Sequence, residues 1–189
     1  MNEYIKSLKD AGKLNISIDK TKTFNWKYNK IAGPCSVEGP EIVDIAKKIK
    51  SLGANAFRAG AYKPCTYPIL KETNGWKEGL REEGLKLLVK VNQETGLPIV
   101  TECMDVRMLD DILQVADVIQ VGTRNFQNYT LLDALGKTRI PVLLKRGTWG
   151  TIDEILGACE RILVGGNDNI AICLRGVVGM PNYRHVFPT

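Results

Sequence analysis

The chain has 189 residues, of which 44% are hydrophobic and 25% are charged, and its formal net charge is +5. This composition is ordinary for a single globular domain, and no apolar run is long enough to cross a bilayer. The charges form no block and no basic run is interleaved with aromatics, so we expect neither nucleic acid nor a membrane as partner.

The five cysteines are widely spaced, odd in number and form no CxxC pair. That usage is typical of a reducing compartment, and residues 1–10 lack the apolar stretch of a secretory signal, so we expect a cytoplasmic protein. The sequence has one histidine, His185, which excludes a catalytic system built on several histidines.

Residues 1–28 are a polar lead-in with weak periodicity, and residues 29–189 are the predicted domain. Short apolar runs alternate there with helical patterns, which predicts βα units and a parallel sheet. The predicted strands are 31–35, 54–61, 97–102, 118–122, 141–145 and 170–174. The segments between them carry the helical patterns, and after Gly176 no pattern is long enough to predict an element.

Several local signals mark the helix ends. Asp105 and Asn128 are predicted N-caps, and Thr151 with Glu154 forms a capping box. The predicted stop signals are Gly53, Gly96 and Gly136. The predicted inner face of the helix at 40–52 consists of Ile42, Ile45, Ala46 and Ile49.

About six βα units fit either a doubly wound open sheet or an incomplete TIM-type (β/α)8 barrel, and the periodicity does not separate them. No GxGxxG follows the first strand, which counts against a dinucleotide-binding sheet. In both folds the ligand lies at the carboxyl ends of the strands.

Cations stand at these predicted strand ends, where Glu102 is the one obvious acid. They are Arg58, Lys63, Arg124, Lys145, Arg146 and Arg175. Half-buried cations are costly unless they are paired, and arginine offers bidentate hydrogen bonds to phosphate and carboxylate. The excess of cations predicts a small ligand with two or three negative charges.

The sequence also carries a series of motifs that resemble those of the 3-deoxy-7-phosphoheptulonate (DAHP) synthase family, in the family's order. The matching segments are Ile31–Ser36, Arg58–Pro64, Thr101–Asp105, Ile119–Asn125, Val142–Gly147 and Ile172–Gly176. The chain is most similar to compact DAHP synthases without a large regulatory extension. The related 3-deoxy-octulosonate 8-phosphate synthases differ after the second strand, where this chain has Lys63 and Pro64.

The resemblance implies a (β/α)8 barrel and a cytoplasmic transferase of the aldolase type. The family condenses phosphoenolpyruvate with erythrose 4-phosphate, the first step of the shikimate pathway to the aromatic amino acids. By resemblance, Lys63 and Glu102 are catalytic, Thr66 binds the aldehyde, and Cys35 is a ligand of a divalent metal, Mn, Fe, Zn or Co. The residues expected to bind phosphoenolpyruvate are Arg58, Lys63, Arg124, Lys145 and Arg175.

The chain departs from the family pattern in three ways, the third of which concerns its C-terminal part. Cys65 replaces an arginine that contacts the sugar phosphate, and Leu174 replaces a frequent glutamate. His185 lies outside the family's Asp-Pro-Ser-His context, and the motifs that follow the sixth strand in the family are not found before Thr189.

These departures leave three readings open: an enzyme, a non-catalytic phosphoenolpyruvate-binding module, and a degenerate fragment without the metal site. Unpaired barrel edges favour a homo-oligomer or pairing with a complementary chain.

Overall fold

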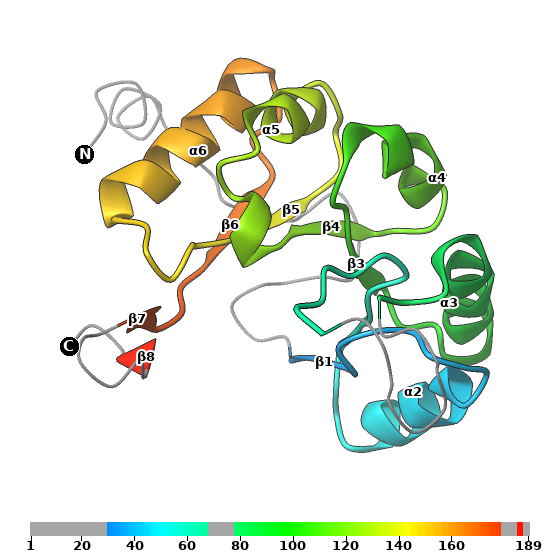
Figure 1. The fold of residues 1–189 in the computed structure, drawn as a ribbon. Helices are drawn as coiled ribbons and strands as arrows, with labels where there is room; N and C mark the ends of the chain where they lie inside the picture. The colour runs from blue at the N-terminus through cyan, green and yellow to red at the C-terminus, as the bar shows by residue number, and fades with distance from the viewer. Residues whose placement is uncertain (1–29, 68–77, 179–184, 187–189) are drawn as a thin grey trace. The chain divides into compact units, whose positions relative to one another are not determined.

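The computed structural model describes residues 30–67, 78–178 and 185–186 (Figure 1). The predicted lead-in, residues 1–28, therefore lies outside the described residues. The chain forms two compact units, the first within Ile18–Ile119 and the second within Gln120–Thr189. Among the described residues, no helix has the length and apolarity that a bilayer crossing requires.

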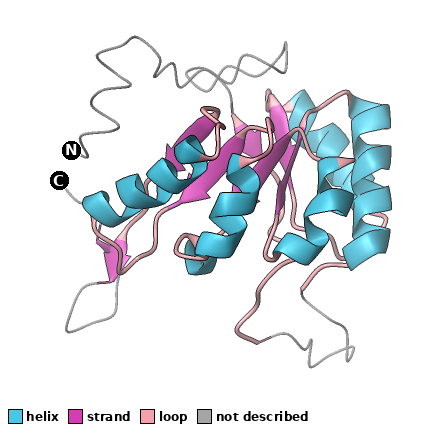
Figure 2. Ribbon diagram, turned by 90° about the horizontal axis from the view of Figure 1, so that it is seen from above, coloured by secondary structure: helices cyan, strands magenta, loops and turns pink. Residues whose placement is uncertain are grey.

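The first unit alternates short strands with longer helices. Its elements are β1 (Ile31–Ala32), α2 (Ile42–Ser51), β2 (Ala56–Arg58), α3 (Arg81–Thr95), β3 (Ile99–Glu102), the 3-10 helix η1 (Val106–Met108) and α4 (Leu109–Leu113). β1 pairs with β2 and β2 with β3, both in parallel, with Ile31 opposite Ala56 and Phe57 opposite Ile99. α2 and α3 pack side by side along these strands (Figure 2).

Apolar residues of β2 and β3 are buried, as expected where helices cover a parallel sheet, whereas both residues of β1 are half-buried. Phe57, Ile99 and Val100 are fully buried, and Leu88 and Val91 of α3 pack into the same core. At about 25 cal/mol per Å² of apolar surface removed from water, this burial is the main force that holds the unit together.

The predicted inner face of α2 is partly wrong. Ile42, Val43 and Ala46 are buried, whereas Ile45 is 37% exposed. At 100° per residue the buried face centres between Ile42 and Val43, and Ile45 lies about 110° from that centre. The buried face of α2 therefore includes Val43 in place of Ile45, and the apolar pattern of the sequence fits either choice.

A tight turn precedes α3, which begins at Arg81. Gly79 has φ +83° and Arg81 has φ +54°, and a side chain at Gly79 would collide with the Ala61 carbonyl. The Arg81 amide donates to Ala61 O at 2.8 Å. This turn therefore holds the start of α3 against the chain just beyond β2. Gly96 ends the helix in the left-handed conformation, as predicted.

The second unit continues the same alternation. Its elements are β4 (Val118–Val121), which spans the boundary between the units, η2 (Thr123–Asn125), α5 (Tyr129–Gly136), β5 (Val142–Lys145), α6 (Ile152–Val164), β6 (Ile170–Cys173), β7 (Val177–Val178) and β8 (His185–Val186). β5 and β6 are parallel, with Lys145 opposite Cys173, and α5 packs along α6.

The predicted helix caps are confirmed. The Asn128 side chain accepts from the Leu131 amide at 3.3 Å, and both hydrogen bonds of the Thr151–Glu154 capping box are present. Asp105 accepts from the Arg107 amide, although it caps η1 rather than an α-helix. The Arg107 guanidinium also hydrogen-bonds the Asp105 carboxylate and lowers its pKa to about 2.

Two features near the helix ends differ from the prediction. Gly136 is the last residue of α5 rather than the residue after it, and it packs closely against the end of α6. A side chain at Gly165 would come within 2.6 Å of the Gly136 backbone. β7 and β8, missed by the sequence analysis, pair in antiparallel fashion with Val178 opposite His185. Strands of two residues carry no periodicity from which they could be predicted.

Candidate active site

The first unit brings together Lys63 and Glu102, the two residues predicted to be catalytic. Glu102 ends β3 with its side chain 3% exposed, and the Lys63 Nζ lies 3.8 Å from its Oε2. Lys63 is itself 16% exposed, and its amide donates to Glu78 O at 2.8 Å. A buried carboxylate requires compensation by charge or hydrogen bonds, so this ion pair fixes the ammonium at the end of the strands.

Arg58 ends β2 beside the segment that contains Gly33 and Pro34. The half-buried guanidinium donates from Nη1 to Pro34 O at 3.3 Å. A side chain at Gly33, where φ is +153°, would collide with the Arg58 carbonyl. The lack of a side chain at Gly33 therefore allows the chain after β1 to lie against the backbone that carries the arginine.

Thr66, expected to bind the aldehyde, lies in the loop after β2 beside Cys65, which replaces the family arginine. Thr66 is exposed, and Cys65 is half-buried with its Sγ 3.3 Å from Tyr67 O. The Cys65 amide also faces Glu78 Oε1 at 3.4 Å. A thiol offers no bidentate contact to phosphate, and Thr66 stays the predicted aldehyde contact of this loop.

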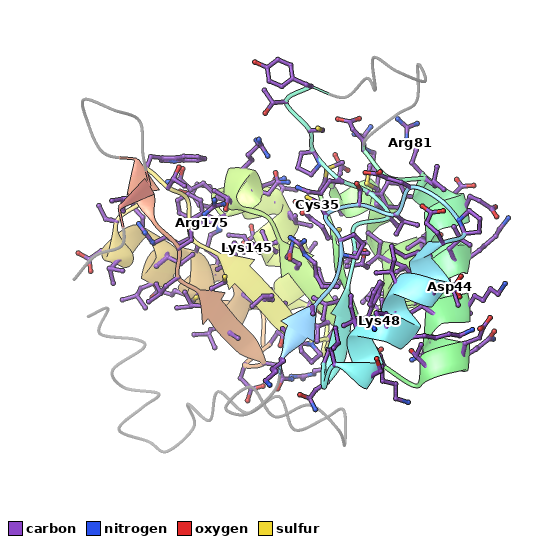
Figure 3. The ribbon with its side chains drawn as sticks, turned by 90° about the horizontal axis from the view of Figure 1, so that it is seen from below. Cys35, Asp44, Lys48, Arg81, Lys145 and Arg175 are labelled. Carbon is purple, nitrogen blue, oxygen red and sulfur yellow. The ribbon has the colours of Figure 1, made fainter. Side chains whose placement is uncertain are left out.

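The second unit places Lys145 and Arg175 on neighbouring strand ends (Figure 3). Lys145 is the last residue of β5 and pairs with Cys173, two residues before Arg175. The Arg175 Nη1 donates to the Thr123 hydroxyl at 2.7 Å, and Thr123 begins η2 after β4. Arg124, the next residue of η2, is exposed. This unit thus gathers three cations at the carboxyl ends of consecutive strands.

Arg146 is a further residue of this region, to which the sequence analysis gave no role beyond its charge. Its side chain is 3% exposed, and Nη1 donates to Gly150 O at 2.7 Å. Nη2 donates to the carbonyl of Arg175. The signal that could have found it is strand alternation: when Lys145 faces one way, the next residue faces the other.

The described residues do not fit a metal site. Cys35 is exposed and its thiol is free. Within residues 30–67, 78–178 and 185–186, no group of three histidine, cysteine, aspartate or glutamate side chains is placed to hold an ion. Cys103, next to Glu102, is buried, which raises the pKa of its thiol to about 11 and keeps it protonated at neutral pH. Cys35 remains a predicted ligand only.

Comparison with protein families gives a match over most of the chain. The model described as the DAHP synthetase I family matches residues 15–186. The chain is 40% identical over 163 residues to the phospho-2-dehydro-3-deoxyheptonate aldolase of Thermotoga maritima, which covers 86% of the chain and 46% of that protein. It is 28% identical over 154 residues to the 2-dehydro-3-deoxyphosphooctonate aldolase of Hydrogenovibrio crunogenus, covering 77% and 53%.

Two solved structures similar to this chain are also of a DAHP synthase. The crystal structure of the T. maritima DAHP synthase has a TM-score of 0.75 at 39% identity and covers 85% of the chain and 45% of that structure. A truncated form of the same enzyme has a TM-score of 0.70 at 39% identity, covering 82% and 54%. The chain thus spans about half the length of the relatives it matches.

The comparison confirms the predicted fold class, an α/β fold of the (β/α)8 barrel type with about six βα units, over the doubly wound alternative. The family match covers most of the sequence, and the two relatives are named phospho-2-dehydro-3-deoxyheptonate aldolase and 2-dehydro-3-deoxyphosphooctonate aldolase. The chain belongs to the DAHP synthetase I family.

Proposed function

We propose that this chain carries the phosphoenolpyruvate-binding residues of an enzyme that condenses phosphoenolpyruvate with an aldose phosphate. The finer form of the proposal is erythrose 4-phosphate as the aldehyde, in the cytoplasmic pathway to the aromatic amino acids. The observation that carries it is the Lys63–Glu102 ion pair, since a buried carboxylate holds a cation at a strand end. Family membership supports the reaction class.

Each unit carries, at its own strand ends, cations suited to phosphate or carboxylate groups. In the first unit these are Arg58 and Lys63, and in the second Arg124, Lys145 and Arg175. The guanidinium groups would bind phosphate or carboxylate oxygens in pairs, and the ammonium groups would act as point charges. As the phosphate group leaves, these cations would stabilise the negative charge that accumulates on its oxygens.

Lys63 and Glu102 would act on the reacting carbons. The methylene carbon of phosphoenolpyruvate attacks the aldehyde, water adds to the neighbouring carbon, and phosphate departs. Glu102 would position that water and accept its proton. Lys63 would hold the anion and compensate the negative charge of Glu102. Their 3.8 Å separation keeps the ammonium beside the carboxylate that would take this proton.

The remaining parts of the family reaction have weaker support in the described residues. In the family a divalent metal polarises the aldehyde. Because the described side chains do not assemble such a site, we assign no step to a metal. Thr66 would bind the aldose phosphate, with Cys65 in place of the family arginine. Association with a second copy or a complementary chain stays a prediction.

Replacement of Arg124 with alanine tests the proposed anion site. We expect phosphoenolpyruvate affinity to fall by about 1–3 kcal/mol, the worth of a charge-assisted hydrogen bond, as measured by calorimetric titration. The matched control is Lys137→Ala, which removes one exposed positive charge from the end of α5, on the side where β5 begins. If Arg124→Ala binds phosphoenolpyruvate as tightly as the parent chain, Arg124 is not part of the site. If Arg124→Ala and Lys137→Ala lose the same affinity, the loss reflects the change in net charge and not a contact of Arg124.

A further inference from the structure

Arg146 occupies an unusual environment for an arginine. Only 3% of the residue is exposed. Both terminal nitrogens of its guanidinium donate to main-chain carbonyls, those of Gly150 and Arg175. Its Nε is a buried nitrogen without a hydrogen-bond partner within the part of the chain that the structure describes. No ion pair of the described residues includes it.

Burial of Arg146 in this way lowers the stability of the folded chain. A buried guanidinium loses its hydration, and two carbonyl oxygens return only part of that loss when no carboxylate compensates the charge. The unmet Nε–H adds a further cost of about 1–3 kcal/mol. A residue that breaks the rules of stability without a local compensation points to a functional demand.

The contacts of Arg146 indicate what that demand is. The guanidinium joins the loop after β5, through Gly150, to the main chain after β6, through Arg175. The Arg175 side chain in turn donates to Thr123 at 2.7 Å. Arg146 therefore fixes the backbone of a cation predicted to bind the ligand, while Thr123 fixes the other end of that cation.

The loop that Arg146 contacts packs tightly against Phe126. Side chains at Gly147 or Gly150 would collide with the buried ring of Phe126, at 2.6 Å in the case of Gly150. Trp149, in the same loop, lies with its ring centroid 5.9 Å from that of Phe126. Close packing against Phe126 thus restrains this loop, and the Arg146 guanidinium connects it to the Arg175 backbone.

We propose that Arg146 is a positioning residue for the bound anion: its two carbonyl hydrogen bonds set the place of Arg175, and its buried charge raises the positive potential at these strand ends. It does not contact the ligand, since its guanidinium is enclosed by protein. A charge in a low-dielectric surrounding acts over several ångströms, so an anion at Arg175 and Lys145 also compensates Arg146. This inference rests on the proposed phosphoenolpyruvate site.

The test compares Arg146→Met and Arg146→Lys in the full chain. We expect Arg146→Met to weaken phosphoenolpyruvate binding at least about ten-fold in calorimetric titration, with little loss or even a gain in thermal stability. Arg146→Lys retains the charge but its single nitrogen cannot span two carbonyls, so it should recover only part of the affinity. A loss of affinity without a matching loss of stability is the signature that a purely structural residue would not give.

The matched control is Arg139→Met. Arg139 also donates to a main-chain carbonyl, Gly166 O at 2.5 Å, but it is exposed and precedes β5. Its replacement should leave affinity within about two-fold of the parent chain. If Arg146→Met binds as tightly as the parent, or if Arg139→Met loses as much, the proposal is overturned. Should Arg146→Met fail to fold, Arg146→Ala with added guanidinium ion replaces it, and restored affinity is then the expected result.

Hydrogen exchange separates failure of this inference from failure of the proposed function. If the parent chain does not bind phosphoenolpyruvate, the proposed function fails. Arg146→Met should still speed amide exchange at Thr148–Gly150 and Arg175–Gly176, and Arg139→Met should not. Unchanged exchange in those segments would reject Arg146 as a positioning residue, whatever the ligand.

Discussion

Replacement of Gly33 with alanine is expected to destabilise the first unit by about 3 kcal/mol and to weaken phosphoenolpyruvate binding as well. The added methyl group would collide with the Arg58 carbonyl, and φ at this position is +153°. Because β1 is short and pairs with β2 directly before Gly33, the chain has little freedom to absorb the collision. The change should shift the urea midpoint of unfolding, and the displaced Arg58 should lower affinity.

The control for Gly33→Ala is Gly53→Ala. Gly53 has φ +89°, yet a methyl group there would meet nothing within 4 Å. It should therefore cost about 1–2 kcal/mol through backbone strain alone and leave phosphoenolpyruvate affinity unchanged. A Gly33→Ala variant no less stable than Gly53→Ala would show that the approach of these two segments is not needed for the fold.

The second large effect is expected at Asn167, which is fully buried. Its Nδ2 donates to Leu135 O at 3.1 Å and Ile140 O at 2.9 Å, and its Oδ1 accepts from the Asn169 amide at 3.0 Å. Asn167→Ala would leave these buried groups unsatisfied, at a cost of about 3 kcal/mol or more in the free energy of unfolding. Denaturant titration measures this loss, which should fall on the second unit.

Asn167→Asp adds a pH dependence to this prediction. Burial among carbonyl oxygens would raise the folded-state pKa of the new carboxyl above its unfolded value of about 3.9. The folded state then binds more protons than the unfolded state, so stability should decrease as pH rises above about 4. The control, Asn92→Ala, removes one bond to Leu97 O at an exposed position and should cost about 1 kcal/mol at all pH values. If the stability of Asn167→Asp does not depend on pH, the buried hydrogen bonds assigned to Asn167 are contradicted.

The sequence predicted most elements because their signals are local. Apolar runs of the right length marked the strands, and Asn128 and the Thr151–Glu154 pair marked helix starts by side-chain chemistry that needs no tertiary contact. The errors arose where packing decides. Gly136 was read as a stop signal although its role is close approach to Gly165, which no local pattern reveals.

The candidate site was predictable to a similar extent. Charges at strand ends, and the motifs around them, pointed to the cations before any geometry was known. The structure places Lys63 and Glu102 3.8 Å apart, whereas the ligand contacts of Arg58, Arg124 and Lys145 stay predictions. Arg146 was missed as a positioning residue because neighbouring cations look alike in sequence, and only the fold shows that Arg146 is enclosed.

Calorimetric titration of the folded chain with phosphoenolpyruvate tests the central claim most directly. The account predicts saturable binding at one site, which weakens as salt is raised and is displaced by inorganic phosphate, because cations at strand ends provide the affinity. A chain that circular dichroism shows to be folded, and that gives no binding heat and no displacement of a phosphate probe at millimolar phosphoenolpyruvate, would contradict it.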